Sequence, residues 1–216
     1  MRLCVVAAAL FTTTWSSASA IERTVTLGLH GDIASSSFSD LGAAGSTSQL
    51  GNVYGVGWGG GLHADFNLVR VQIRFSMDFI HYDIDQSKFR ESVRTQFGTA
   101  SNAVTVDGGG LALLALNVGG KLPIVVIPRV SPYVTAGGGL ALLNRDQLMA
   151  SIGPFAPGNS GYLYPSESQR AKPSLNLGLG VDIDLGLKLY VEAKYAWIFN
   201  NGGTSSYAPI SIGVTF

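Results

Sequence analysis

The stretch Leu187-Lys-Leu-Tyr-Val-Glu-Ala-Lys-Tyr-Ala-Trp-Ile-Phe199 alternates strictly between two kinds of side chain. Its odd positions are apolar and end in the aromatic residues Tyr195, Trp197 and Phe199. Its even positions carry the charges Lys188, Glu192 and Lys194. Because a strand places alternate side chains on opposite faces, one face is apolar and the other is charged. The stretch is longer than the roughly 5–6 residues of an ordinary strand and suits a tilted, membrane-spanning strand of about 9–11 residues.

The same period of two recurs along the chain and predicts about eight strands. Residues 175–185 alternate Leu, Val and Ile with Asn, Gly and Asp, and a tight turn at Gly186 joins them to the stretch above. Two segments are ambiguous, because 106–118 is apolar on both faces and 130–143 is rich in Gly and Ala. The predicted strands are 24–34, 52–67, 70–82, 105–119, 129–143, 172–185, 187–199 and 207–216.

The connections between these strands alternate in length. Short turns are predicted at 67–69, 121–128 and Gly186. Long polar loops are predicted at 35–51, 83–104 and 144–171, with a smaller one at 200–206. Short turns on one side and long loops on the other are typical of an outer-membrane barrel. The predicted fold is therefore all-β, an eight-stranded antiparallel up-and-down transmembrane barrel.

The N-terminus reads as a cleavable signal peptide at 1–20, which leaves a barrel domain at 21–216. Arg2 supplies the positive charge, 3–11 the short apolar region, and Ala18-Ser19-Ala20 the small-residue cleavage site. The apolar region is too short to cross a bilayer as a helix. The single cysteine, Cys4, lies inside it, so the mature chain is expected to hold no disulfide.

Composition limits the function classes. Charged residues make up 13% of the chain, against about 25% in an ordinary soluble domain. Lys plus Arg and Asp plus Glu are both 14, and no basic stripe indicates nucleic-acid binding. A soluble β-sandwich would also alternate. The long strands and an aromatic girdle at the strand ends favour the membrane barrel over the sandwich. The girdle is predicted from Tyr54, Trp58, Phe79, Tyr195, Trp197 and Phe199.

Over residues 24–216 the layout resembles the eight-stranded outer-membrane β-barrel family that includes the OmpA transmembrane domain, OmpX and the opacity proteins. Pro132-Tyr133-Val134-Thr135-Ala136-Gly137-Gly138-Gly139 is similar to a phrase that opens the fifth strand, and Tyr190-Val191-Glu192-Ala193-Lys194-Tyr195 resembles the seventh. Val214 and Phe216 resemble the signal that the barrel-assembly machinery reads. The family often has Gly five positions before the end, where this chain has Ser211 and places Gly at 213. Members of the family have different activities, so the fold does not give the function.

Inward charges form the first candidate site. An eight-stranded barrel is just wide enough for its own side chains, so charges inside it must pair. We expect a plug of ion pairs, with a conducting path as the alternative. The predicted lumen network is Arg74, Asp78, Asp182, Asp184, Lys188, Glu192 and Lys194, with His63 and Asp65 near the periplasmic end.

The histidines form the second candidate. Lipid-modifying barrel enzymes use His, Ser and a carboxylate, but none of His30, His63 and His81 has the His-x-Ser-Asn phrase of the deacylase type. No cluster has metal-ligand spacing, so no catalytic, metal or cofactor site is predicted. The run Gly55, Gly57 and 59–61 lacks the order of a phosphate loop, and its glycines are expected to make room in a crowded lumen or to allow curvature.

The predicted function is a non-enzymatic outer-membrane barrel of a Gram-negative-type cell, either structural or a surface-interaction protein that presents long extracellular loops. Its expected partners are outer-membrane lipids, the barrel-assembly machinery and a surface ligand held by outer loops such as 151–168, with no nucleic acid. Two alternatives stay open. One is a narrow channel for small or apolar solutes, and the other is a lipid-modifying enzyme.

Overall fold

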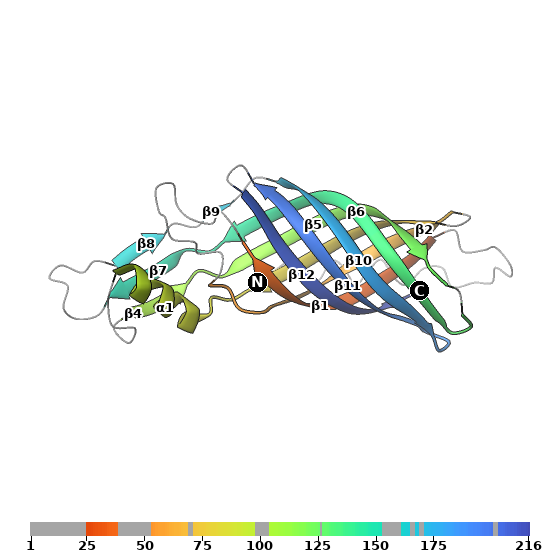
Figure 1. Ribbon diagram of the computed structural model, residues 1–216, viewed down its shortest axis with the longest axis horizontal. Helices are drawn as coiled ribbons and strands as arrows, with labels where there is room; N and C mark the ends of the chain where they lie inside the picture. Colours follow the sequence, from red (N-terminus) through yellow and green to blue (C-terminus); the bar gives the residue numbers. More distant parts are fainter. Residues whose placement is uncertain are drawn as a thin grey trace, which may run out of the picture.

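The computed structural model describes residues 25–38, 53–68, 71–97, 104–125, 127–152, 161–164, 167–168, 171–200 and 203–216. The expected signal peptide at 1–20 lies outside these ranges and stays a prediction, as does the domain boundary at residue 21. Eight long antiparallel strands form a closed barrel (Figure 1). They are β1 (Val25–Ser37), β2 (Gly57–Asn67), β3 (Gln72–Tyr82), β5 (Leu111–Pro123), β6 (Val130–Arg145), β10 (Lys172–Asp184), β11 (Lys188–Asn200) and β12 (Gly203–Thr215).

The barrel closes between strands that are far apart in the sequence. Each strand pairs with the next along the ring, β6 pairs with β10, and β12 pairs with β1 in a register that sets Gly28 opposite Thr215. Leu27 and Phe216 exchange backbone hydrogen bonds of 3.3 and 2.7 Å at the end of this seam. Closure leaves no unpaired edge among the barrel strands, which is how a sheet satisfies its backbone polar groups inside a membrane.

Side chains alternate between the lumen and the outer surface, as the sequence predicted. Leu177 on β10 points outward and is 54% exposed, whereas Glu192 on β11 points into the lumen and is 1% exposed. The exposed large apolar side chains continue around the barrel on every one of its strands. This surface matches the outward apolar band of a transmembrane barrel. Among the described residues, no helix is long and apolar enough to cross a membrane.

An apolar layer fills the half of the lumen that lies toward the long connections. This layer explains why β5 looked apolar on both faces, since Leu111, Leu113 and Ala115 point inward while Leu116 and Val118 point outward. On β6, the ambiguous facing resolves with Tyr133, Ala141 and Leu143 inside. The layer consists of Ala34, Phe38, Tyr54, Ile80, Tyr82, Leu111, Leu113, Ala115, Ala141, Leu143, Ala196, Ile198 and Tyr207.

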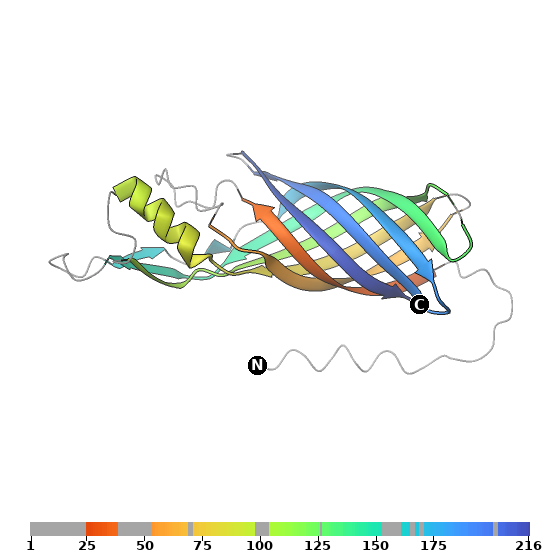
Figure 2. The ribbon, with the colours of Figure 1, turned by 60° about the horizontal axis from the view of Figure 1, so that its bottom comes forward.

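The long connections carry structure of their own, which the sequence analysis took for loops. The strands β4 (Val104–Gly108), β7 (Leu148–Ile152) and β8 (Gly161–Tyr164) form a second antiparallel sheet. Helix α1 (Gln86–Phe97) precedes it, and β9 (Glu167–Ser168) pairs with the end of β6. Figure 2 shows this sheet and α1 beyond one end of the barrel, while the C-terminus lies at the other end. We call α1, β4, β7 and β8 the outer platform.

The predicted strand 105–119 is wrong, because the chain divides it between the outer platform and the barrel. β4 ends at Gly108, and β5 starts at Leu111. Gly108 and Gly109 have φ angles of 76° and 81°, a backbone region in which a side chain is strained. These glycines therefore break the strand and redirect the chain.

Two further predictions, about where strands β2 and β12 begin, are wrong. Tyr54 was assigned to the lipid-facing girdle, but it is 4% exposed and belongs to the apolar layer. The strand begins only at Gly57, so the alternation counted outward from Trp58 does not reach Tyr54. The last strand starts at Gly203 rather than 207, which makes the connection after Asn200 much shorter than expected.

The other girdle residues lie on the outside of the barrel. Trp58, Phe79, Tyr195 and Phe199 are exposed, and Trp197 is half-buried with its ring 4.8 Å from that of Tyr195. All five lie near the end of the barrel that carries the outer platform, which fits aromatic residues at a membrane interface.

Helix α1 begins at a side-chain cap. Asp85 accepts hydrogen bonds from the backbone N–H of Ser87 at 3.0 Å and of Lys88 at 3.3 Å, which satisfies two free donors of the first turn. The Ser87 hydroxyl also donates to Asp85, and these bonds hold the pKa of that carboxyl below its ordinary value. Phe89 in the first turn is buried, and so is Val53 in the segment before β2. The Val53 carbonyl accepts a hydrogen bond from the Asp85 N–H.

Candidate functional site

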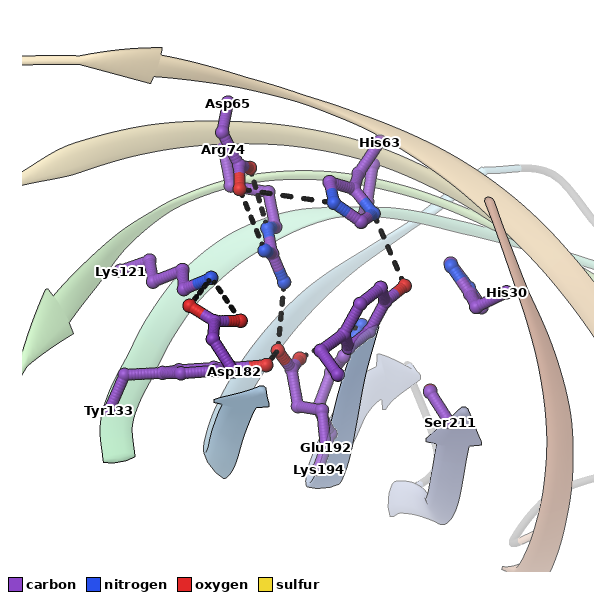
Figure 3. Close-up of polar contacts among 12 residues, drawn as sticks. His30, His63, Asp65, Arg74, Lys121, Tyr133, Asp182, Glu192, Lys194 and Ser211 are labelled. Carbon is purple, nitrogen blue, oxygen red and sulfur yellow. Dashed lines mark hydrogen bonds and ion pairs between the residues drawn. The ribbon is translucent and has the colours of Figure 1, made fainter. Parts of the chain in front are cut away.

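The candidate site is a polar layer in the half of the lumen that lies toward the C-terminus. Arg74 on β3 stands at its centre, because the register of β2 and β3 sets it opposite Asp65. Its Nε and Nη2 donate to the two carboxylate oxygens of Asp65 at 2.7 and 2.8 Å, and its Nη1 donates to Glu192 Oε2 at 2.8 Å (Figure 3). The Tyr133 hydroxyl donates to the same Glu192 oxygen at 2.7 Å. Two carboxylates therefore enclose one buried guanidinium.

Two lysines extend this network. Lys121 Nζ lies 2.7 Å from Asp182 Oδ2 and sits 4.0 Å from the centre of the Tyr133 ring (Figure 3). Lys194 Nζ lies 3.4 Å from Glu192 Oε1 and 3.9 Å from Asp78 Oδ2. Paired, hydrogen-bonded charges of this kind are the form in which charge is tolerated in a poorly solvated interior.

His30, Asp32 and Asp78 form a second cluster next to the first. His30 Nε2 lies 2.8 Å from Asp78 Oδ1 and 3.4 Å from Asp32 Oδ2. The Ser211 hydroxyl donates to the other oxygen of Asp32 at 2.5 Å. The His63 ring stacks on His30 with centroids 6.1 Å apart, and His63 Nδ1 lies 3.3 Å from the Tyr190 hydroxyl. Both imidazoles are thus held inside the barrel.

The structure brings together most of the residues predicted for the lumen network. Arg74, Asp78, Asp182, Glu192 and Lys194 all contribute to the polar layer, as do His63 and Asp65. Asp184 and Lys188 were predicted to face the lumen, but they do not belong to the polar layer. They are register partners flanking Gly186, both are exposed, and Asp184 Oδ1 accepts from the Gly186 N–H at 3.1 Å. The alternation that would point their side chains into the lumen ends at this turn.

Sequence reasoning missed several members of the layer. Lys121 was assigned to a turn, although β5 continues to Pro123 and points it inward. Tyr133 was noted only as part of a family phrase, and Asp32 and Ser211 were not assigned to the lumen. The signal for all four was the inward parity of their strands, which requires correct strand ends to be used.

Inward glycines make room for the large side chains of the lumen, and within the predicted run Gly57 does so for the Tyr82 ring. A Cβ atom at Gly180 would overlap the Tyr133 ring, and one at Gly213 would lie 2.6 Å from Tyr190 Cε1. A cavity of about 20 Å³ remains beside Arg74, Asn117, Thr135 and Glu192. That volume holds about one water molecule, so the polar layer nearly fills its cross-section.

The arrangement does not form a nucleophile activated by a base. Ser211, Asp32 and His30 converge, but the Ser211 hydroxyl donates to the carboxylate and not to the imidazole that would have to accept its proton. The group lies inside the barrel rather than at its outer rim. At the rim, His81 Nε2 lies 3.1 Å from Asp83 Oδ1, on an exposed pair.

Val214 and Phe216 were predicted to act as an assembly signal. Val214 lies at the end of β12, and Phe216 directly follows this strand and is exposed. Their role in assembly stays a prediction.

Comparisons with known proteins agree with the fold. The family described as the outer membrane protein beta-barrel domain matches residues 4–216. The crystal structure of Neisserial surface protein A is similar at 15% identity and a TM-score of 0.54, covering 89% of this chain and 96% of that one. The attachment invasion locus protein Ail of Yersinia pestis is 15% identical with a TM-score of 0.41, covering 89% and 96%. The N-terminal barrel domain of Pseudomonas aeruginosa OprF is 12% identical with a TM-score of 0.41, covering 88% and 97%.

A search of the curated proteins returned no match. The predicted eight-stranded barrel and its location are confirmed by the closed strand ring and by the family match over nearly the whole chain. This chain belongs to the outer membrane β-barrel family, and its place is the outer membrane of the Gram-negative cell.

Proposed function

We propose that this protein is a non-enzymatic, closed barrel that anchors the outer platform at the cell surface. The observation that carries the proposal is the filling of the lumen by two successive layers. The apolar layer blocks the end toward the outer platform, and the polar layer around Arg74 blocks the end toward the C-terminus. A conducting path would need a continuous polar lumen, which the buried side chains of Leu113, Tyr82 and Ile198 oppose.

The outer platform supports a role in surface interaction. Both of its long connections leave the same end of the barrel, and they fold into a sheet and a helix instead of short turns (Figure 2). A rigid scaffold that positions such connections is the common arrangement for binding. The exposed charges near it are of mixed sign, because Lys88 Nζ lies 3.9 Å from Asp85 Oδ2 and both Asp83 and Asp107 are exposed, so they select no polyanion or polycation by themselves.

The first test is conductance of the refolded protein in a planar bilayer. A closed wild-type protein is expected, because both layers have to open before ions can pass. Stable, reproducible openings in the wild type would overturn the proposal and favour the narrow channel. The Glu192→Ala variant removes one member of the polar layer, and Lys188→Ala removes a charge at an exposed turn as its matched control. Rare openings are expected only with Glu192→Ala.

The second test addresses the outer platform. Cells that display the full chain are compared with cells that display a barrel in which residues 104–108 and 148–164 are replaced by short Gly-Ser linkers. Cell binding to immobilised host glycans and matrix proteins is expected to fall with the shortened form, while the heat-dependent gel shift of the barrel is unchanged. Equal binding by both forms on every surface would contradict the surface-interaction role.

A further inference from the structure

In the second cluster of the lumen, one buried carboxylate oxygen is held by an ion pair without a hydrogen bond. Asp32 Oδ2 has no hydrogen-bond partner, although the Asp32 side chain is only 1% exposed. This oxygen points at His30 Nε2, which also faces Asp78 Oδ1. The three atoms lie within 4.8 Å of one another. A buried acceptor without a donor is costly, so a positively charged group beside it would be stabilised.

The geometry points to a binding site for one divalent transition-metal ion of the zinc type, held by His30 Nε2, Asp32 Oδ2 and Asp78 Oδ1. We call it the His30 site. One imidazole nitrogen and two carboxylate oxygens are ordinary zinc ligands, and three protein ligands leave the fourth position for a water molecule. Oxygen and imidazole ligands together suit first-row divalent ions better than calcium or magnesium, which take oxygen ligands alone.

The distances between the three atoms fit such an ion. Ligands about 2.0–2.2 Å from a tetrahedral ion lie roughly 3.3–3.5 Å from each other. The separation of His30 Nε2 and Asp32 Oδ2 is 3.4 Å. That of His30 Nε2 and Asp78 Oδ1 is 2.8 Å, a hydrogen bond, and it has to widen by roughly half an ångström for the imidazole nitrogen to turn its lone pair to the ion.

A surrounding shell orients the ligands. Ser211 donates to the Asp32 oxygen that does not face the site. Ser76 and Asn117 donate in the same way to Asp78 Oδ2, at 3.2 and 3.3 Å. Each carboxylate thus has one oxygen occupied by the protein and turns the other toward the site. Metal-binding carboxylates are commonly fixed by such outer hydrogen bonds.

Gly61 on β2 keeps the space beside the ligand atoms free. A Cβ atom at this position would lie 2.7 Å from His30 Nε2 and 2.9 Å from Asp78 Oδ1. Any other residue would place a carbon against two of the three ligand atoms and against the Met77 carbonyl oxygen, so glycine lets these ligand atoms approach each other over the strand.

The local charges favour a cation. Two carboxylates face the site, and the permanent cation Lys194 lies 3.9 Å from Asp78 Oδ2, the oxygen that does not face the site. Lys194 is shared with Glu192, which is closer to it at 3.4 Å. No metal site was predicted from the sequence. The spacing His30-x-Asp32 gives only two ligands, and the third comes from a strand two places along the ring.

The test refolds the barrel domain, residues 21–216, in detergent with excess Zn²⁺, removes free metal by dialysis, and counts bound metal by mass spectrometry. Loading during refolding is used because both lumen layers cover the site. One zinc per wild-type barrel is expected, falling at least tenfold in His30→Ala and in Asp32→Asn. The His81→Ala variant removes the histidine of the exposed His81–Asp83 pair and is expected to keep one zinc.

Asp32→Asn keeps the shape of the side chain and an oxygen that can accept from Ser211. It therefore removes the negative charge of one ligand without leaving a cavity. Folding of every variant is checked by the difference in gel migration with and without boiling. Cobalt gives a second signal, because Co²⁺ bound by one nitrogen and oxygens absorbs visible light, and this absorption is expected to vanish in Asp32→Asn. A wild type with less than about a tenth of an equivalent of zinc overturns the proposal. Zinc retained by both site variants, or lost in His81→Ala, also overturns it.

Discussion

Arg74 and Glu192 lie on strands that face each other across the barrel, and their side chains meet in its centre with Nη1 2.8 Å from Oε2. Three strands separate β3 from β11 whichever way the ring is followed. The pair is 118 residues apart in the chain, so it ties together parts of the barrel that no backbone hydrogen bond connects.

Replacing Glu192 with Ala is expected to destabilise the barrel by about 3–5 kcal/mol, because it leaves the buried Arg74 Nη1 and Tyr133 hydroxyl without their acceptor. Urea unfolding in detergent or lipid vesicles, followed by tryptophan fluorescence, measures the change. Lys188→Ala, which removes an exposed charge four residues earlier on the same strand, is expected to change the free energy of unfolding by less than about 0.5 kcal/mol. Equal effects of the two variants would contradict the central role of the Arg74 pair.

Replacing Gly180 with Ala is expected to cost about 1–3 kcal/mol, because the new methyl group would enter the space of the buried Tyr133 ring. Gly31 is the matched control, since the nearest atom to a Cβ there is 3.9 Å away. Combining Gly180→Ala with Tyr133→Leu is expected to cost less than the sum of the two single changes. Additive costs would show that Gly180 and Tyr133 do not compete for the same space.

Leu113 and Leu177 test the two sides of the barrel wall. Leu113→Ala is expected to cost about 2–5 kcal/mol, because Leu113 is fully buried in the apolar layer and its loss leaves a cavity. Leu177→Arg is expected to cost about 2–4 kcal/mol if this outward position lies near the middle of the bilayer. Leu177→Ala is the matched control, with the smallest cost of the three expected from the same unfolding measurement. A larger cost for Leu177→Ala than for Leu113→Ala would reverse the assignment of inside and outside.

Asp85→Ala is expected to fray the start of α1, whereas Asp85→Asn keeps an acceptor and is expected to preserve it. The pKa of Asp85 is lowered in the folded protein, so its stabilising contribution is present above the ordinary value of 3.8 and is lost as the pH falls below it. Amide hydrogen exchange of Ser87 and Lys88 measures both effects. Protection that is the same in Asp85→Ala, and the same at pH 3 and pH 6, would contradict the cap.

The strands of this barrel were largely predictable, because their two faces contact different surroundings. The predicted strand 187–199 differs from β11 by one residue at each end, since lipid outside and charge inside give the alternation full contrast. The contrast disappears where the lumen itself is apolar. For that reason 105–119 looked like one strand, and the break at Gly108 and Gly109 could not be seen.

The partners inside the lumen were less predictable than the residues. Inward parity identifies Arg74, Asp78 and Glu192 as lumen residues, but it does not say which of them meet across the barrel. The His30 site shows the same limit, because Asp78 joins His30 and Asp32 from another strand. These contacts depend on the stagger of the strands around the ring, and the sequence of one strand does not determine that stagger.

The seam between β1 and β12 has a consequence for the kinetics of folding. Its pairs, such as Gly28 with Thr215, join residues from opposite ends of the barrel sequence, so their contact order is the highest that this chain allows. Closing that seam is therefore expected to come late and slowly. Because Leu27 and Phe216 end side by side, a circular permutant that links these ends and opens the chain at Gly186 would turn the seam into a local hairpin. In this permutant β10 and β11 become the first and last strands, so the late closing step is expected to move to their seam while the register is kept.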